Sequence, residues 1–448
     1  MAMQRDMTVG SPMRMIIEFT IPVFLGNIFQ QIYSMVDTII VGKFVGTKAL
    51  AAVGSTSTIV FLILGFLSGF TVGVTVITSQ RFGAGDMKGM RRTIGSAYIL
   101  AGIIAFIMTV VSMTGMRSLL VLMNTPEDIF EDAYAYIIVI CGGIATTMLY
   151  NLLACMLRAI GNSKTPLYFL ILSAMLNVVL DFVFILIFKM GTAGAAYATV
   201  IAQAVSGICC LVYILKCVPL LRIHRADFKP DAKIVKNQLG VSLPMGFQYS
   251  ITAIGTMMVQ SALNLLGSVY VAGYTAGCKI EQMITQAYVA MGTTMAAYCA
   301  QNTGAHKSDR IRKGFRAAVI IGTVYSVITG VFLIFAGKYL TPLFINEDLE
   351  AVTEGVDLCL KCAGYFLIPL AFINIFRNGI QGMGYGILPM MAGVTELIAR
   401  GIVAVISAKY LSYFGVCMAD PVAWIFAGAL VVVMYFYVAK RADREWNS

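Results

Sequence analysis

The acidic residues that lie inside long apolar stretches are the first candidates for chemistry in this sequence. Asp37, Asp181, Glu281 and Glu396 each lie within such a stretch. In a bilayer a charged side chain costs about 2.5–3.5 kcal/mol on insertion scales, so acids placed there mark ion pathways, proton relays or ion pairs. Glu396 precedes Arg400 by four residues, a spacing that favours an intrahelical ion pair.

Asp37 and Asp181 have further oxygen-bearing side chains at a matching depth. Asn177 precedes Asp181 by four residues and shares its helix face, and the predicted spans place Tyr136 and Thr199 at a similar level. Carboxylate, amide and hydroxyl oxygens suit Na⁺, and a desolvated carboxylate readily holds a proton. The sequence therefore predicts a site for H⁺ or Na⁺ at these five residues. The alternative is that each aspartate only fixes the packing of its helix.

The elements that carry these residues require a membrane around them. Of 448 residues, 59% are hydrophobic and only 12% are charged, whereas soluble domains contain about 25% charged residues. Continuous apolar runs of this length cross a bilayer as helices. We predict an all-α integral membrane protein with about twelve spans, at residues 15–42, 51–80, 93–115, 131–157, 165–188, 193–217, 239–267, 274–302, 315–337, 356–382, 387–408 and 419–440.

The basic residues predict the orientation of these spans. Most Lys and Arg residues fall in the segments that are cytoplasmic if the N-terminus is cytoplasmic, which places both termini on that side. We therefore attribute the net charge of +10 to membrane orientation and expect no nucleic-acid partner. The short loops lead us to expect a monomeric multi-pass protein of the cell (inner) membrane, with the lipid bilayer as its surroundings.

The chain consists of two repeated groups of six spans. Pro22 in the first span corresponds to Pro244 in the seventh, and the sequence QRFGA at residues 80–84 corresponds to QNTGA at residues 301–305. Duplicated halves are a common transporter design, with the substrate between them. We expect a first lobe at 1–222, a cytoplasmic linker at 223–237 and a second lobe at 238–448.

The repeat also bears on the role of the two aspartates. Asp181 aligns with Ala404, and Asp37 aligns near Val259, so neither acid has an acidic counterpart in the other half. A packing role common to both halves would have kept the acids in both. This difference favours a functional role for Asp37 and Asp181.

These landmarks resemble the multidrug and toxic compound extrusion (MATE) family over essentially the whole chain. The resemblance rests on Gln80-x-x-Gly83-Ala84 and its repeat, on Arg158-Ala159-Ile160-Gly161 with Pro166, and on Gly191-x-x-Gly194-Ala195-Ala196-Tyr197-Ala198-Thr199 followed by Gln203. It implies two six-helix lobes in a V shape around a central cavity, with cation-coupled efflux by alternating access. The cation site of the family's first lobe matches Asp37, Asn177, Asp181 and Thr199, and a site tyrosine matches Tyr136.

The resemblance also carries a prediction about the branch of the family. NorM-type members use acids in the seventh and tenth helices, but residues 241–266 and the core of the tenth span carry none. The chain looks closer to the DinF- and MepA-type branches, the latter having an acid in the eighth helix, where Glu281 stands. We expect Glu281, Gln30 and Met258 to line a substrate cavity, and Pro22 to act as a hinge. The alternative for Glu281 is an ion pair with Arg400 from another helix.

The predicted function is secondary active efflux of small organic cations or drugs in exchange for H⁺ or Na⁺, without a cofactor. One alternative is a lipid-linked oligosaccharide flippase of the same superfamily, although such cavities tend to carry basic residues, whereas the first six spans here carry acids. Another is a major facilitator type transporter, whose loop motif Gly83-x-Gly85-Asp86 with Arg91-Arg92 superficially matches.

No catalytic or cofactor motif is visible, so we do not expect an enzyme. The two histidines, His224 and His306, lie in predicted cytoplasmic loops. Most of the ten cysteines lie inside spans, where they behave as small apolar residues. Cys359-x-x-Cys362 has no His or second cysteine pair beside it in the sequence, so we predict no metal or redox role for it.

Overall fold

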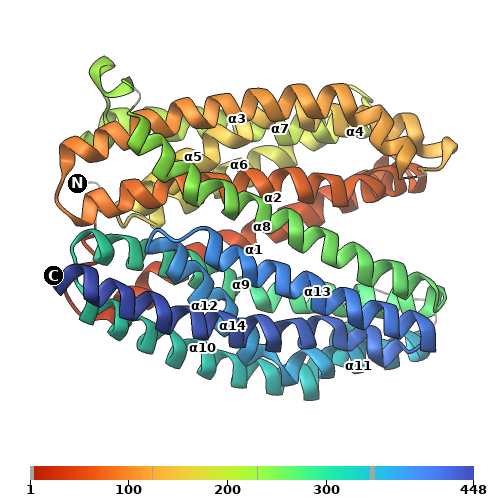
Figure 1. Cartoon of the computed structure of the whole chain (residues 1–448). Helices are drawn as coiled ribbons and strands as arrows, with labels where there is room; N and C mark the ends of the chain where they lie inside the picture. Colours follow the sequence, from red (N-terminus) through yellow and green to blue (C-terminus); the bar gives the residue numbers. More distant parts are fainter. Residues whose placement is uncertain (1–4, 124, 230, 344–348, 448) are drawn as a thin grey trace. The chain divides into compact units, whose positions relative to one another are not determined.

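The computed structural model describes residues 5–123, 125–229, 231–343 and 349–447, which are helical with short connections and contain no strand. Helices are the expected form because a bilayer offers no hydrogen-bond partner to the backbone of apolar segments. The α helices are α1 (Pro12–Phe44), α2 (Thr47–Gly83), α3 (Met87–Leu122), α4 (Glu127–Gly142), α5 (Ile144–Ala159), α6 (Lys164–Asp181), α7 (Gly191–Cys217), α8 (Ala232–Asn264), α9 (Ser268–Gly304), α10 (Ser308–Ala336), α11 (Leu349–Tyr365), α12 (Leu367–Gly382), α13 (Ile387–Tyr410) and α14 (Tyr413–Asn447) (Figure 1).

Four short elements complete the chain. A π-helical segment, η1 (Phe182–Ile187), continues α6. The 3₁₀ turns η2 (Pro219–Leu221) and η3 (Arg225–Phe228) lie between α7 and α8, and η4 (Gly337–Leu343) follows α10.

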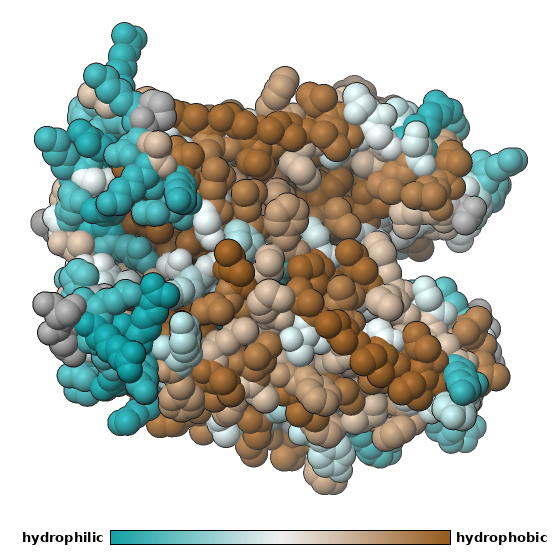
Figure 2. Space-filling view, in the orientation of Figure 1, coloured by the Kyte–Doolittle hydropathy of each residue, from teal (hydrophilic) through white to brown (hydrophobic). Residues whose placement is uncertain are grey.

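Each of the twelve predicted spans coincides with one helix or one bent pair of helices, which confirms the predicted fold class. The chain bends by 47° between α4 and α5 and by 52° between α11 and α12. In the described ranges, eight helices are long and apolar enough to cross a membrane, or ten if each bent pair counts as one span. On the face seen in Figure 2, hydrophobic side chains cover the long flanks of the helices and hydrophilic ones gather at their ends.

The chain divides into two compact units. The first contains the residues up to Asp6 and Leu25–Gly246, and the second contains Met7–Phe24 and the residues from Phe247 onward. These ranges differ from the expected lobes at 1–222 and 238–448, because α1 and α8 each divide their packing between both units. The change of unit falls two residues after Pro22 in α1 and two residues after Pro244 in α8.

The segment expected as a cytoplasmic linker, residues 223–237, packs on the first unit. A Cβ added at Gly95 of α3 would lie 2.3 Å from the carbonyl oxygen of Asp227 in η3, so the two backbones are in direct contact. Farther along, Nε2 of Gln238 donates to the carbonyl oxygens of Val74 and Thr93 at 3.1 and 2.9 Å. These contacts explain why residues 223–246 belong to the first unit.

The segment before α1 is held by the second unit in the same manner. The guanidinium of Arg310 donates to the carbonyl oxygens of Met7, Val9 and Gly10 at 3.1, 3.2 and 2.8 Å. Its Nε also donates to Oδ1 of Asn302 at 3.1 Å. Charge-assisted bonds to backbone carbonyls are the stronger kind, so the start of α1 is fixed on α9 and α10.

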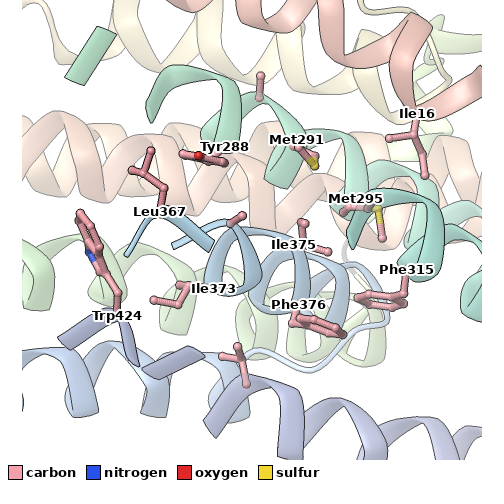
Figure 3. Packing of buried hydrophobic residues seen from close by; sticks show 14 of the residues in the cluster. Ile16, Tyr288, Met291, Met295, Phe315, Leu367, Ile373, Ile375, Phe376 and Trp424 are labelled. Atoms are coloured by element: carbon pink, nitrogen blue, oxygen red, sulfur yellow. The ribbon is translucent and has the colours of Figure 1, made fainter. Parts of the chain in front are cut away.

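Each unit has its own apolar core. In the second unit, the ring of Phe315 on α10 stacks on Phe376 of α12 with a centroid distance of 5.2 Å (Figure 3). Tyr435 of α14 lies 4.3 and 5.2 Å from these two rings. In the first unit, Leu67 and Phe70 of α2 are completely buried in a cluster shared with α3, α4 and α5.

Candidate functional site

The structure brings the five residues predicted to form a cation site together within the first unit. Asp37 lies toward the end of α1, Asn177 and Asp181 lie on the last turn of α6, Tyr136 is on α4 and Thr199 is on α7. Asp181 and Asn177 are 0% and 1% exposed, and Asp37 and Tyr136 are 9% and 8% exposed. Tyr136 lies within electrostatic reach of both aspartates. Four helices therefore converge on one buried polar cluster.

The two carboxyl groups of this cluster, Asp37 and Asp181, interact directly with each other. In the described ranges, no basic side chain interacts with either of them. Two carboxylates in contact inside an apolar environment cannot both stay ionised unless a proton or a cation is added. The pair therefore requires a positive charge that the surrounding side chains do not supply.

Four buried side-chain oxygens of this cluster, all of them able to accept a hydrogen bond, have no hydrogen-bond partner in the described part of the chain. They are Oδ1 of Asp37, both carboxyl oxygens of Asp181 and Oδ1 of Asn177. Nδ2 of Asn177 donates to Oγ1 of Thr199 at 3.3 Å, and this hydroxyl in turn donates to the carbonyl oxygen of Ala195 at 3.1 Å. Asn177 and Thr199 thus donate to other acceptors, and four acceptor oxygens remain.

The backbone around Asp181 departs from a regular α helix. The π-helical segment begins at Phe182, the residue after Asp181, and such segments often occur at functional sites. Gly194 at the start of α7 packs against it, because a Cβ added there would lie 3.2 Å from Cβ of Phe184. The wider turn and the glycine contact together fix where α6 presents Asp181.

This donor set fits a small hard cation as well as a proton. Carboxylate, amide and hydroxyl oxygens are the ligands that hard cations prefer, and Asp37, Asn177, Asp181 and Thr199 offer all three kinds. A proton shared between the two carboxyl groups satisfies the same charge requirement. The chemistry available is therefore reversible binding of H⁺ or of a cation such as Na⁺.

The other predicted site residues lie outside this cluster. Gln30 is exposed on α1 in the part that belongs to the first unit. Met258 on α8 is 38% exposed, and Glu281 on α9 is partly buried; both belong to the second unit. Pro22 is buried inside α1. Gln30 thus differs from the members of the cluster in its exposure.

Comparison with known proteins identifies the family. A family model described as MatE matches residues 22–183 and again residues 244–406, which together make up more than half of the chain. The chain belongs to the MatE family. The match to MatE excludes the major facilitator alternative. It also supports the repeat, because the two matched segments are offset by 222 residues at their starts and 223 at their ends.

Relatives of this MatE protein carry names that refer to drug resistance. It is 30% identical to the probable multidrug resistance protein YpnP of Bacillus subtilis, over 96% of both chains. It is 24% identical to the probable multidrug resistance protein NorM of Thermotoga maritima, over 88% of this chain and 85% of that protein. These matches do not decide between the branches, so the DinF- or MepA-type assignment stays a prediction.

Solved structures share the fold of this MatE chain over nearly its whole length. A crystal structure of MATE in complex with MaL6 superposes with a TM-score of 0.92 at 22% identity, covering 98% of this chain and 99% of the other. An outward-facing multidrug resistance MATE family transporter of the MOP superfamily gives 0.91 at 23% identity, covering 98% of both. At these identities the likeness concerns the fold.

The second unit of this MatE protein also contains acids in its interior, of which Glu396 and Asp420 are paired with arginines. Nε of Arg400 lies 2.6 Å from Oδ1 of Asp420, and its Nη1 lies 3.4 Å from Oε2 of Glu396. Arg377 contacts the other oxygen of Glu396 at 3.1 Å. The predicted pair of Glu396 with Arg400 is therefore present. Glu281 interacts electrostatically with Arg400 and Asp420 without forming an ion pair in the described ranges.

Some residues at these sites were missed from the sequence. Tyr33 interacts with Asp37 and with Gln203. The side-chain oxygen of Gln203 in turn accepts a hydrogen bond from the hydroxyl of Thr147. Tyr33 lies four residues before Asp37 on the same helix face, and this spacing could have indicated from the sequence that it lies near the cation site. Asp420 was not counted among the acids inside spans because it lies near the start of the last one, although the Asp420–Arg400 contact is the shortest in its cluster.

Proposed function

We propose that this MatE protein is a secondary active exporter that moves small organic cations or drugs out of the cell in exchange for H⁺ or Na⁺. One observation carries the proposal: two interacting carboxyl groups contribute three oxygens without a hydrogen-bond partner, Asn177 contributes a fourth, and no basic side chain in the described ranges interacts with the pair. A site of this kind holds an exchangeable cation rather than a fixed one. The drug-resistance names of relatives that match nearly the full chain support the same reading.

In the proposed cycle, the coupling ion enters the cluster from outside and neutralises Asp37 and Asp181. A ligand shifts a conformational equilibrium only by its different affinity for the two states. The neutralised cluster favours the state that is open to the cytoplasm, where the ion leaves and the substrate binds. We assign the bending to α1, because it changes unit two residues after Pro22.

For the organic cargo, we propose Glu281, an acid of the second unit within the membrane-spanning region. Glu281 is partly buried and is not neutralised by an arginine of its own, so it is available to a cationic substrate. Met258 and Gln30 are exposed side chains that would contact the apolar and polar parts of such a cargo. We place both termini in the cytoplasm on the distribution of Lys and Arg.

The proposal is tested by efflux of ethidium from vesicles that contain the purified chain, with a proton gradient and a sodium gradient imposed separately. We expect the wild type to extrude the dye under one of them, which names the coupling ion. Asp37→Asn and Asp181→Asn should reduce efflux to the level of empty vesicles. Asp357→Asn is the matched control, because its carboxylate already pairs with Lys361 on the same helix at 2.6 Å.

Two results would contradict parts of the proposal. If both variants export like the wild type, the cluster does not carry the coupling. If the wild type moves no cationic dye under either gradient, the cargo is not an organic cation, and transport of a lipid-linked oligosaccharide becomes the next hypothesis.

A further inference from the structure

The second unit contains a buried cluster at the position that corresponds to the cation site of the first. The repeat offset of 222 to 223 residues matches Asp37 with Val259 and Asp181 with Ala404. Val259 and Ala404 lie in one buried cluster, so this counterpart is a real packing unit and not only an alignment. Both carboxylates have been replaced there by apolar side chains.

The counterpart cluster contains thiols from three different helices. Cys359 on α11 and Cys417 on α14 belong to one buried cluster, and the thiol of Cys359 interacts with those of Cys417 and of Cys278 on α9. Cys359 and Cys417 are buried at 3% and 5% exposure, whereas Cys278 is partly exposed and gives access to the group. By the same offset, Cys359 corresponds to Tyr136 of the first unit. The central residue of this thiol cluster thus stands where the first unit has a cation-site residue.

Close helix packing fixes the spacing of these thiols. A Cβ added at Gly277 would lie 3.0 Å from Sγ of Cys359, and one added at Gly273 would lie 3.2 Å from Cα of Gly355. Small residues four apart allow helix backbones to approach in this way. Because α9 and α11 touch at two successive turns, Cys278 and Cys359 cannot separate without unpacking both helices.

The number of ligands restricts what such a cluster can bind. Structural zinc takes four ligands, and in the described ranges no group of three or more His, Cys, Asp and Glu side chains is arranged to hold one metal ion. Two thiolates suffice for soft metal ions that coordinate linearly, a preference that follows ligand softness. The apolar surroundings favour a product without net charge.

We propose that Cys359, together with Cys278 or Cys417, binds one soft, two-coordinate metal ion of the copper(I), silver(I) and mercury(II) class. With mercury(II), two S–H protons leave, two sulfur–mercury bonds form, no electron is transferred and the product is neutral. Mercury(II) is therefore the member of the class that best suits apolar surroundings. This inference does not rest on the proposed ion coupling in the first unit.

The test uses the full-length chain in detergent micelles, reduced with a phosphine and desalted. Mercury(II) chloride is added, the sample is dialysed against excess glutathione, and the metal that remains is measured by atomic spectrometry. Glutathione competes with single thiols but not with two thiols that are already held together, because the chelate has a high effective concentration. We expect the wild type to retain one mercury ion per chain.

Matched cysteine variants decide whether these cysteines form a metal-binding site or only pack in the core. Cys359→Ser should lose the retained mercury, and Cys359→Ala repeats the test if the serine variant does not give a monodisperse protein. Cys299→Ser is the control, because Cys299 is also buried on α9 but contacts none of the three thiols; it should retain mercury like the wild type. Mercury-free wild type after dialysis, or full retention by the Cys359 variants, would overturn the proposal.

Discussion

In the first unit Asp37 and Asp181 contact each other without a basic partner, whereas in the second unit Glu396 and Asp420 are bound by Arg377 and Arg400. The two units arise from one repeat, and each has acids in its interior. The difference is the source of the balancing charge. The second unit carries cationic side chains beside its acids, whereas in our proposal the first takes up a proton or a metal ion from outside.

The repeat relation shows one of the sequence changes behind this difference. At an offset of 223 residues, Arg400 of the second unit corresponds to Asn177 of the first. Asn177 has a buried carbonyl oxygen without a hydrogen-bond partner in the described ranges, whereas Arg400 supplies a guanidinium to its neighbours. Neither aspartate has an acidic counterpart in the second unit, so the residue at the Asn177 position is one of several that separate the two charge patterns.

Exchanging that residue should produce the largest effect. In Asn177→Arg the guanidinium lies one turn from Asp181 and within reach of Asp37, so it replaces the exchangeable cation permanently. We expect ion-driven dye efflux to fall to the level of empty vesicles while the protein remains monodisperse. Asn177→Gln keeps a neutral amide and is the control, which should retain measurable efflux. Normal export by Asn177→Arg would show that the two units do not differ in the source of the charge that balances their acids.

The second-largest effect concerns stability in the second unit. Arg400→Met leaves Asp420 and one oxygen of Glu396 without their cation, and breaking a buried ion pair from one side costs about 3–5 kcal/mol. The double variant Arg400→Met with Asp420→Leu removes both charges, so most of this loss should be recovered. Thermal unfolding in detergent measures both. Equal destabilisation by the single and double variants would mean that packing, rather than charge pairing, determines the stability of this region.

The helices were predictable because their signal is local. Apolar length predicted twelve segments, each of which coincides with one helix or one bent pair, and this signal does not depend on which neighbours a helix contacts. The bend between α4 and α5 was missed because residues 131–157 read as one apolar run. It occurs at Gly143, where a Cβ would lie 2.3 Å from the side chain of Val200 on α7. That approach is a tertiary contact, which no pattern within the span reveals.

The sites were predictable only in part, for a related reason. Depth along each span placed Asp37, Asn177, Asp181, Tyr136 and Thr199 at one level, but depth does not say which helices touch. The division of α1 and α8 between units was not predictable, since the repeat pattern treats each span as a whole. The same limit applies to Cys359, whose partners lie on α9 and α14 rather than in its own Cys-x-x-Cys segment.

A smaller effect should distinguish Asp37, which has no basic partner in the described ranges, from Asp420, which pairs with Arg400. The free energy of unfolding should change in opposite directions when each is replaced by asparagine. Asp37→Asn gives Asp181 an amide donor in place of a second carboxyl, which replaces repulsion with a hydrogen bond of about 1 kcal/mol. We expect a modest increase in the free energy of unfolding. Asp420→Asn should lower it instead, since Arg400 loses a charged partner. If both variants are destabilised equally, Asp37 is a structural residue and its burial has another explanation.

The smallest effect tests whether the hydroxyl of Thr199 belongs to the cation site. It accepts from Asn177 and donates to the carbonyl oxygen of Ala195. Thr199→Val keeps the shape of the side chain but leaves Nδ2 of Asn177 without an acceptor, a loss of about 1 kcal/mol. The concentration of coupling ion that half-saturates efflux should rise about fivefold. Thr199→Ser retains the hydroxyl and should behave like the wild type, so equal behaviour of the two variants would remove Thr199 from the site while leaving Asp37 and Asp181 in place.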